Sequence, residues 1–331
     1  MWCIEKAWER PMFGSLIRSF NAAQPLGTAT DMSSQPSFEG SSTDRSGSAM
    51  PRSLYGYEII DFLGEGAGSM IYAASDPITN QLYALKHVVV KKEKDQRFVE
   101  QLINEFEVGG KIQHPALRRC VDLKVTKTLL RKPTDAALVM EMVEGTSCEI
   151  RPPTDMPMLI NVFHQTAGAL AALHAQNFVH CDLKPNNILI TRGKKVKIID
   201  FGQACPVGSV KKRIQGTPDF IAPEQVRCEP VTVQTDVYNL GATFYWMLSG
   251  SKLPTLFTLK KSRNSFLLAD AIKHPHELNP HVPENLSNLV MDCCRITPAK
   301  RPESMTDLCR RLEIIGQMLP GDSGTSSTLS A

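Results

Sequence analysis

The sequence predicts an α+β fold in which a small, mainly antiparallel β-sheet part precedes a larger, mostly α-helical part. Short runs rich in β-branched and aromatic residues occur between positions 57 and 143. After Pro153 the apolar residues recur with a period of about 3.6, which is typical of helices. This order of elements favours two lobes with a natural cleft between them.

The expected elements follow in chain order. Strands are predicted over 57–63, 70–74 and 81–90, then a charged helix over 94–111, then strands over 117–127 and 136–143. A helical face follows, formed by Leu159, Val162, Phe163, Thr166, Leu170 and Leu173. Further helices are expected near 235–249, 284–294 and 304–316.

Composition excludes several classes of protein. The chain has 331 residues, of which 42% are hydrophobic, enough for a sizeable core, and its net charge of +3 is too small to indicate a nucleic-acid partner. Nine scattered cysteines form no CxxC pair, which favours reduced thiols in a cytoplasm. The longest apolar helix candidate, Val237 to Leu248, is shorter than the ~18 residues of a membrane span, so no span is expected.

The ends of the chain differ in composition from its middle. Residues 21–52 are rich in Ser, Gly, Thr, Pro and Gln, so 1–54 is predicted to be a disordered N-terminal segment, dispensable for folding. Trp2, Trp8 and Phe13 leave open a docking segment at the start. One domain is expected over 55–317, with its small lobe over 55–143 and its large lobe over 144–317, before a disordered tail over 318–331.

A glycine-rich turn lies between the first two long strands, with the sequence Leu63-Gly64-Glu65-Gly66-Ala67-Gly68-Ser69-Met70-Ile71. Glycines let a backbone come close to phosphates and direct its N–H groups at them, although an ordinary hairpin turn also favours glycine. The next strand contains Tyr83-Ala84-Leu85-Lys86. A lysine in an apolar strand either extends its amine to solvent or needs an anionic partner, which Glu105 could supply.

The strongest local signal is Val179-His180-Cys181-Asp182-Leu183-Lys184-Pro185-Asn186-Asn187-Ile188-Leu189-Ile190. Its Asp, Lys and Asn provide a proton acceptor, a cation for a phosphate and an oxygen ligand for Mg²⁺, the parts that phosphoryl transfer needs. A second apolar strand ends in Asp200-Phe201-Gly202, where the carboxylate is a hard Mg²⁺ ligand. Taken singly, each acid would more commonly be a turn or cap residue.

In their order along the chain, these motifs and Ala222-Pro223-Glu224 resemble the eukaryotic-type Ser/Thr protein kinase family over about 57–316. The resemblance implies the two-lobed protein kinase fold, the cofactors ATP and Mg²⁺, and transfer of the γ-phosphoryl group to a protein Ser or Thr hydroxyl. It assigns the catalytic base to Asp182, the γ-phosphate contact to Lys184, the α/β-phosphate contact to Lys86 paired with Glu105, and the metal to Asn187 and Asp200. It assigns nucleotide contacts to the glycine-rich turn from Leu63 to Ile71 and to Ala84, Glu141, Val143 and Leu189, with Met140 at the gatekeeper position.

The resemblance extends through the second half of the chain. It implies a buried ion pair between Glu224 and Arg301, an acid on a helix, Asp236, that braces the catalytic loop, and a docking stretch in which Thr217 reaches Asp182. Lys184 within its motif resembles Ser/Thr rather than Tyr kinases.

Four departures from the family qualify these expectations. Ser69 replaces the third glycine of the turn, which the family tolerates, and Asn186 removes one reason to expect basic substrates. Gly109 stands where a bulky residue usually packs on Phe201, so the Glu105 helix is a candidate site for a regulatory partner. Cys181 replaces the arginine that normally binds a phosphorylated activation loop, so activity independent of that phosphorylation is expected. Cys181 itself could be a small buried filler or a redox-sensitive thiol.

The residues alone leave two other functions open. A pseudokinase scaffold would bind nucleotide or partners with little catalysis, although such proteins usually lose one of the four positions kept here as Lys86, Asp182, Asn187 and Asp200. A small-molecule kinase on a related fold would not need the Ala222-Pro223-Glu224 region and its docking stretch.

Overall fold

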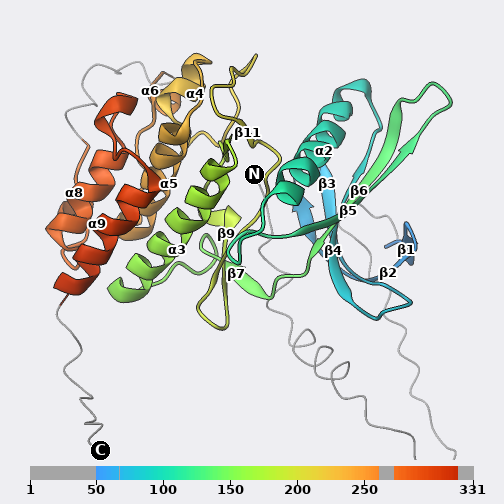
Figure 1. The fold of residues 1–331 in the computed structure, drawn as a ribbon, viewed down its shortest axis with the longest axis horizontal. Coiled ribbons are helices and arrows are strands. Elements are labelled where there is room, and N and C mark those ends of the chain that lie inside the picture. Colours follow the sequence, from blue (N-terminus) through green and yellow to red (C-terminus); the bar gives the residue numbers. More distant parts are fainter. Residues whose placement is uncertain (1–49, 67, 261–271, 320–331) are drawn as a thin grey trace, which may run out of the picture. The chain divides into compact units, whose positions relative to one another are not determined.

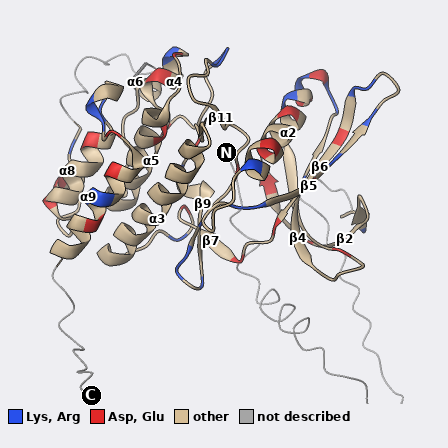
Figure 2. Cartoon of the chain, viewed as in Figure 1, with Lys and Arg blue, Asp and Glu red and all other residues tan. Residues whose placement is uncertain are grey.

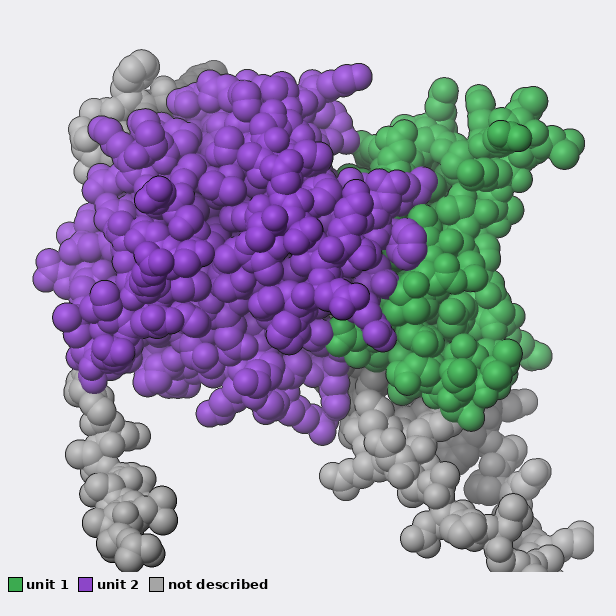
Figure 3. Space-filling model, viewed as in Figure 1, with its two compact units in different colours: residues 1–102, 121–142 green, residues 103–120, 143–331 purple. Residues whose placement is uncertain are grey.

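A computed structural model describes residues 50–66, 68–260 and 272–319. The expected disorder of the N-terminal segment and of the C-terminal tail falls almost wholly outside these ranges. The chain divides into two compact units, one formed by residues 1–102 and 121–142 and the other by 103–120 and 143–331 (Figure 3). Residues 103–120 thus belong with the second unit although they lie between the two segments of the first.

Unit 1 is built on a six-stranded sheet with the strand order β1-β2-β3-β4-β6-β5 (Figure 1). Its strands are β1 (Ser53–Leu54), β2 (Tyr57–Gly66), β3 (Ser69–Ser75), β4 (Leu82–Val89), β5 (Cys120–Lys127) and β6 (Pro133–Glu141). The pairs from β1 to β4, and β4 with β6, are antiparallel. Each strand predicted from the sequence is confirmed, while pairing already begins at Ser53, two residues before the expected domain start.

The sheet buries small and branched side chains on its central strands. Ala74, Leu85 and Val139 are almost fully buried and form one cluster across β3, β4 and β6. The turn between β2 and β3 needs glycine at Gly68, where φ is +83° and an added Cβ would lie 2.4 Å from the Phe98 ring. Packing of Phe98 thus fixes which residue this turn can carry.

The predicted charged helix is α2 (Gln96–Lys111), which follows a 3₁₀ turn at Glu93–Asp95. Unit 2 contains α3 (Met156–Ala175), α4 (Pro223–Arg227), α5 (Val233–Ser249), α6 (Leu256–Lys260), α7 (Pro275–Leu278), α8 (Glu284–Cys293) and α9 (Met305–Met318). The helices expected near 235–249, 284–294 and 304–316 are confirmed as α5, α8 and α9. No helix within the described ranges is long and apolar enough to cross a membrane.

Short strands accompany these helices. β9 (Ile188–Thr191) lies between β10 (Val196–Ile198) and β7 (Gly145–Ser147), and β8 (Phe178–Val179) pairs with β11 (Cys205–Pro206). Both arrangements are antiparallel. They place the loop from His180 to Asn187 between β8 and β9, so its two ends are fixed by strand pairing.

The core of unit 2 forms around α3 and α5. Phe163 of α3 stacks on Phe244 of α5 with ring centroids 3.9 Å apart. α5 contains a single charged residue, Asp236, and most of its side chains are buried. By contrast, α9 carries both acidic and basic residues, which are coloured in Figure 2. A helix whose side chains are buried on nearly all sides belongs in an interior, and α5 is such a helix.

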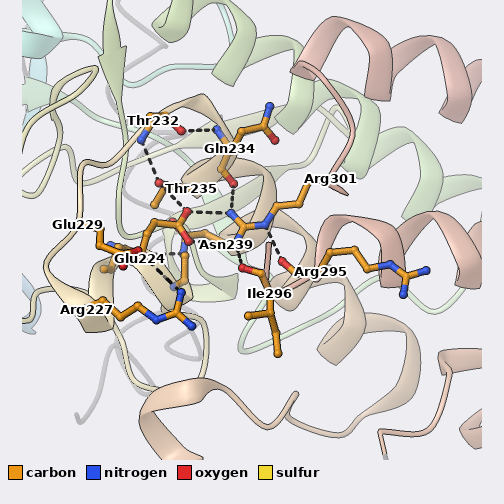
Figure 4. A network of polar contacts seen from close by, with 12 residues as sticks. Glu224, Arg227, Glu229, Thr232, Gln234, Thr235, Asn239, Arg295, Ile296 and Arg301 are labelled. Carbon is orange, nitrogen blue, oxygen red and sulfur yellow. Dashed lines mark hydrogen bonds and ion pairs between the residues drawn. The ribbon is translucent and has the colours of Figure 1, made fainter. Parts of the chain in front are cut away.

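The expected ion pair between Glu224 and Arg301 is confirmed, and the guanidinium is fully satisfied (Figure 4). Nη1 and Nη2 of Arg301 donate to the two Glu224 oxygens at 2.8 and 3.0 Å. The other three N–H groups donate to main-chain oxygens of Gln234, Arg295 and Ile296. All five donors of an arginine are therefore used, so this buried charge joins α4, α5 and the chain before α9.

Burial alone would raise the pKa of Glu224, but the hydrogen bonds and charge of Arg301, with Thr235 Oγ1 donating at 2.9 Å, keep that pKa below its ordinary value. Glu224 is thus charged at neutral pH and depends on Arg301 for that charge.

Arg301→Ala should reduce the free energy of unfolding by about 3–5 kcal/mol, because it leaves a buried carboxylate without its cation. Thermal melting should show a midpoint several degrees lower. Arg295→Ala is the matched control, since the Arg295 side chain makes an exposed pair with Asp292 at 3.1 Å and its main-chain oxygen, which binds Arg301, is kept. Equal melting of wild type and Arg301→Ala would contradict the role given to this pair.

Candidate active site

A single carboxylate of α5 holds the start of the loop that follows β8. Asp236, which is fully buried, accepts hydrogen bonds from the main-chain N–H groups of His180 and Cys181 at 2.8 and 2.9 Å. His174 Nε2 lies 2.8 Å from Oδ2, the oxygen that also accepts from His180 N. Burial would raise the pKa of Asp236, yet the hydrogen bonds from His174 and the loop keep that pKa below its ordinary value. The expected bracing by Asp236 is confirmed.

This bracing imposes an unusual backbone on the loop. Cys181 has a φ of +64°, a left-handed conformation that non-glycine residues adopt infrequently. Two bonds hold it there, from its N–H to Asp236 and from Gln225 Nε2 to its carbonyl oxygen at 2.7 Å. The left-handed turn reverses the chain directly before Asp182.

Asp182 contacts Thr217 and Lys184, two residues for which the sequence predicted a role. Thr217 Oγ1 donates to Asp182 Oδ1 at 2.8 Å, which confirms the expected contact. Lys184 Nζ lies 3.2 Å from Asp182 Oδ2 and donates to Thr217 Oγ1 at 3.0 Å. An acid, an amine and a hydroxyl thus converge at one point, the arrangement needed to orient a hydroxyl beside a phosphate.

Asn187 and the residue before Asp200 are joined by main-chain hydrogen bonding. Asn187 uses its amide nitrogen to bind Asp182 O at 2.9 Å, and its main-chain oxygen accepts from Ile199 N, the residue before Asp200. Mg²⁺ takes oxygen ligands and is usually held by only one or two protein side chains. An amide oxygen and a carboxylate fixed by neighbouring main-chain bonds suit that ion. Asp200 also has a positive φ of +68°.

Asn104 helps to hold the chain that follows Asp200, and this role was not predicted from the sequence. Its Nδ2 lies 2.8 Å from the main-chain oxygen of Ala204 and 3.2 Å from that of Phe201, with Gly202 O at 3.4 Å. Asn104 therefore ties the second half of α2 to the chain that follows Asp200. Its partners are main-chain atoms, so no residue type in the sequence signals the contact.

Glu105 is fully buried in unit 2, where Arg118 Nη2 lies 3.5 Å from its Oε1. Lys86, its expected partner, lies in unit 1 on β4, where it pairs with Ile71 of β3 and Leu138 of β6. The pairing of Lys86 with Glu105 therefore stays a prediction. Arg118, a second missed residue, places a cation beside this carboxylate.

The remaining residues of the expected nucleotide site are distributed over both units. In unit 1 the glycine-rich turn joins β2 to β3, with Ala67 outside the described residues, Ala84 pairs with Met140, and Glu141 ends β6. Val143 and Leu189 belong to unit 2, where Leu189 lies on β9. Their contact with one nucleotide stays a prediction.

Gly109 has a local explanation. A Cβ added at Gly109 would lie 2.6 Å from Cys120 Sγ and 3.8 Å from Phe201 Cδ2. The buried Cys120 side chain thus occupies the space where the family carries a bulky residue on the helix. The side-chain volume that α2 lacks at Gly109 is thus supplied by Cys120, the first residue of β5.

Gly109→Ala should destabilise the protein despite the better helix propensity of alanine, because the new methyl group overlaps Cys120 Sγ. The double variant Gly109→Ala/Cys120→Ala removes that overlap. Chemical denaturation of the wild type, both single variants and the double variant should give a double variant more stable than the sum of the single effects by about 1 kcal/mol. Gly110→Ala is the control, since no atom lies within 4 Å of its added Cβ. Additive effects would mean that the two side chains do not compete for this space.

Comparison with known proteins gives the same kind of domain for the family match and for each similar protein. Residues 57–311 match the protein kinase domain. Serine/threonine-protein kinase PknD of Chlamydia pneumoniae is 25% identical over 295 residues, which cover 78% of this chain and 31% of that protein. Serine/threonine-protein kinase PrkC of Bacillus subtilis is 26% identical over 267 residues, covering 76% of this chain and 39% of that protein. Serine/threonine-protein kinase pkn2 of Myxococcus xanthus is 30% identical over 274 residues, covering 77% of this chain and 32% of that protein.

This chain accordingly spans about a third of the length of these relatives. The match to the domain covers well over half of the chain and includes Asp182, Asn187, Asp200 and the pair of Glu224 with Arg301. The chain belongs to the protein kinase domain family.

Proposed function

We propose that this chain is a Ser/Thr protein kinase that transfers the γ-phosphoryl group of Mg-ATP to a protein Ser or Thr hydroxyl. One observation carries the proposal: Asp182, Lys184 and Thr217 converge at distances of 2.8 to 3.2 Å next to Asn187, which binds the same loop. The relatives that match most of this chain are named as serine/threonine-protein kinases, which supports the same activity.

In this proposal Asp182 orients the substrate hydroxyl and accepts its proton as the new oxygen–phosphorus bond forms. Lys184 balances the charge of the transferred group from one side of that carboxylate. Asn187 and Asp200 would hold Mg²⁺, which supplies neutralisation of the phosphate oxygens when it is bound. Thr217 holds the Asp182 carboxylate in position until the substrate hydroxyl arrives.

The nucleotide contacts are proposed on the family's pattern. Lys86, paired with Glu105, would hold the α- and β-phosphates beneath the glycine-rich turn from Leu63 to Ile71. Ala84, Glu141, Val143 and Leu189 would line the adenine. This assignment makes 55–143 the small lobe and 144–317 the large lobe of a two-lobed kinase fold.

A protein substrate is favoured over a small molecule by the polar network behind Thr217. Gln225 Nε2 donates to the main-chain oxygens of Cys181 and Gln215, and its Oε1 accepts from Asn239 Nδ2. This network holds the stretch that precedes Thr217 to the catalytic loop, as needed to present an extended peptide. The absence of a nucleic-acid partner and a cytoplasmic location are proposed from the sequence, on the net charge of +3 and on scattered cysteines without a CxxC pair.

A regulatory partner is proposed at the Glu105 helix. Gly109 and Gly110 each cost about 1 kcal/mol of helix stability relative to alanine. Gly110 is exposed and has open space beside it. A partner that binds there would stabilise the helix that carries Glu105.

Substitutions at the assigned site residues distinguish an active kinase from a pseudokinase. Asp182→Asn, Asp200→Ala and Lys86→Met should each lower the rate of transfer from Mg-ATP by ~10² to 10³ or more, since each removes a charge at the reacting centre. Transfer of labelled γ-phosphate to a generic protein substrate measures the effect. Asp292→Asn is the control, because it breaks only the exposed pair with Arg295. Near wild-type turnover in all three variants would reject the assigned site, and an inactive wild type would favour the scaffold.

We also propose that the kinase is active when the segment from Asp200 to Glu224 is not phosphorylated. Cys181 supplies no cation for a phosphate, and the segment is already anchored. Val207 N donates to Asn177 O, Gly208 N to Val231 O, and Val231 N to Ser209 O, at 2.7 to 3.0 Å. Ser209 Oγ donates to Pro206 O at 2.6 Å, so the unmodified hydroxyl is part of the ordered turn.

Ser209→Ala should leave kcat within about threefold of wild type, which is less than about 1 kcal/mol in the barrier. Phosphatase treatment of the wild type should have an equally small effect. Both are measured with the same protein substrate, and intact mass determination establishes the phosphorylation state of each sample. A hundredfold loss after dephosphorylation, matched by Ser209→Ala, would show that a phosphate on this residue is required.

A further inference from the structure

Two buried thiols meet beside the candidate active site. Cys181 Sγ and Cys205 Sγ lie 3.8 Å apart, close enough for a hydrogen bond in which either can donate. Cys181 precedes Asp182, and Cys205 lies on β11, where it pairs with Val179 of β8. Together with Val179 and Val231 they form a small apolar cluster of their own. This is the one sulfur–sulfur hydrogen-bond contact between described residues.

The two sulfurs differ in reactivity. The hydrogen bond from Cys181 lowers the pKa of the Cys205 thiol, burial opposes that effect, and the charge of Lys211 and hydrogen bonding to Ser209 lower the pKa further. The pKa of Cys181 is raised, first by its hydrogen bond to Cys205 and then by burial. Of the two, Cys205 is the thiol that loses its proton more readily, and the thiolate is the form that reacts.

Three other described cysteines, Cys148, Cys294 and Cys309, lack this combination. Burial raises the pKa of Cys148 and of Cys294 to about 12, which keeps both protonated. Cys309 donates to His164 O at 3.8 Å, with its pKa raised to about 11. Reaction with an oxidant should therefore favour the Cys181–Cys205 pair over these three thiols.

We propose that Cys181 and Cys205 are a modification site that a peroxide converts into a reversible disulfide, and that this disulfide inhibits phosphoryl transfer. The Cys205 thiolate attacks one oxygen of hydrogen peroxide, the O–O bond breaks, and a sulfenic acid and one water form after proton uptake. The Cys181 sulfur then attacks the Cys205 sulfur, the S–O bond breaks, and the Cys181 proton leaves with the hydroxyl as a second water. Two thiols and one peroxide thus give one disulfide and two waters, and a dithiol reductant reverses the change.

Inhibition follows from where Cys181 is held. A disulfide requires the sulfurs to approach from 3.8 Å to about 2.05 Å. Cys181 is bound at its N–H by Asp236 and at its carbonyl by Gln225, so the pull is transmitted to the next residue, Asp182. Displacement of a catalytic group by about 1 Å can cost 10²-fold in rate. This consequence rests on the proposed kinase function, whereas the disulfide itself does not.

The test uses the full chain treated with hydrogen peroxide, followed by alkylation of remaining thiols, digestion and mass spectrometry. A peptide pair linked through positions 181 and 205 should form in the wild type and disappear with dithiothreitol. Transfer should fall about tenfold or more as the linked fraction rises, and should recover on reduction. Cys205→Ala should remain active under reducing conditions and keep its activity in peroxide. Cys309→Ala, which removes a distant thiol, should behave as the wild type.

Each outcome of this experiment decides a separate part of the proposal. Absence of the 181–205 link while other thiols oxidise would overturn the modification site. A complete link with unchanged transfer would overturn the inhibition, as would equal loss of activity in Cys205→Ala. A reduced wild type without transfer would count against the proposed kinase function, while the mass measurement would still decide the disulfide.

Discussion

The buried polar face of α5 is the constraint on which the candidate site depends. Thr235, Asp236, Asn239 and Thr243 are all buried within an otherwise apolar helix. Buried polar groups must find hydrogen-bond partners, and these four find them on other segments: the Glu224 carboxylate, the main-chain N–H groups of His180 and Cys181, Phe220 O and Leu183 O. The helix thus acts as a template that positions both sides of Asp182.

Local patterns were sufficient to predict most of the framework. Strand and helix positions follow from alternation and from the helical period, which depend on neighbouring residues only. The contacts of Asp236, and of Thr217 with Asp182, came from an ordered set of motifs whose roles are carried by side-chain chemistry. The pair of Glu224 with Arg301 was predicted in the same way, although its further bonds to three main-chain oxygens were not.

The rest could not be predicted because the information lies in partners that have no sequence signature. Asn104 and Gln225 bind main-chain oxygens, which every residue offers. The space at Gly109 is filled by Cys120, eleven positions further on, and a missing volume does not indicate where its replacement comes from. Cys181 was noted as a substitution for arginine, but its neighbour Cys205 became visible only through the pairing of β8 with β11.

Main-chain hydrogen bonds anchor the chain around Cys205 at several points. β8 and β11 pair at two positions, and the N–H groups of Val207 and Gly208 bind the oxygens of Asn177 and Val231. Bonds of this kind do not depend on which side chain a residue carries, proline excepted. Surface residues such as Pro206 and Val210 can therefore vary over evolution while the path of the segment is preserved. Exchange of such exposed side chains would change the surface that this segment presents, without rebuilding the loop that holds Asp182.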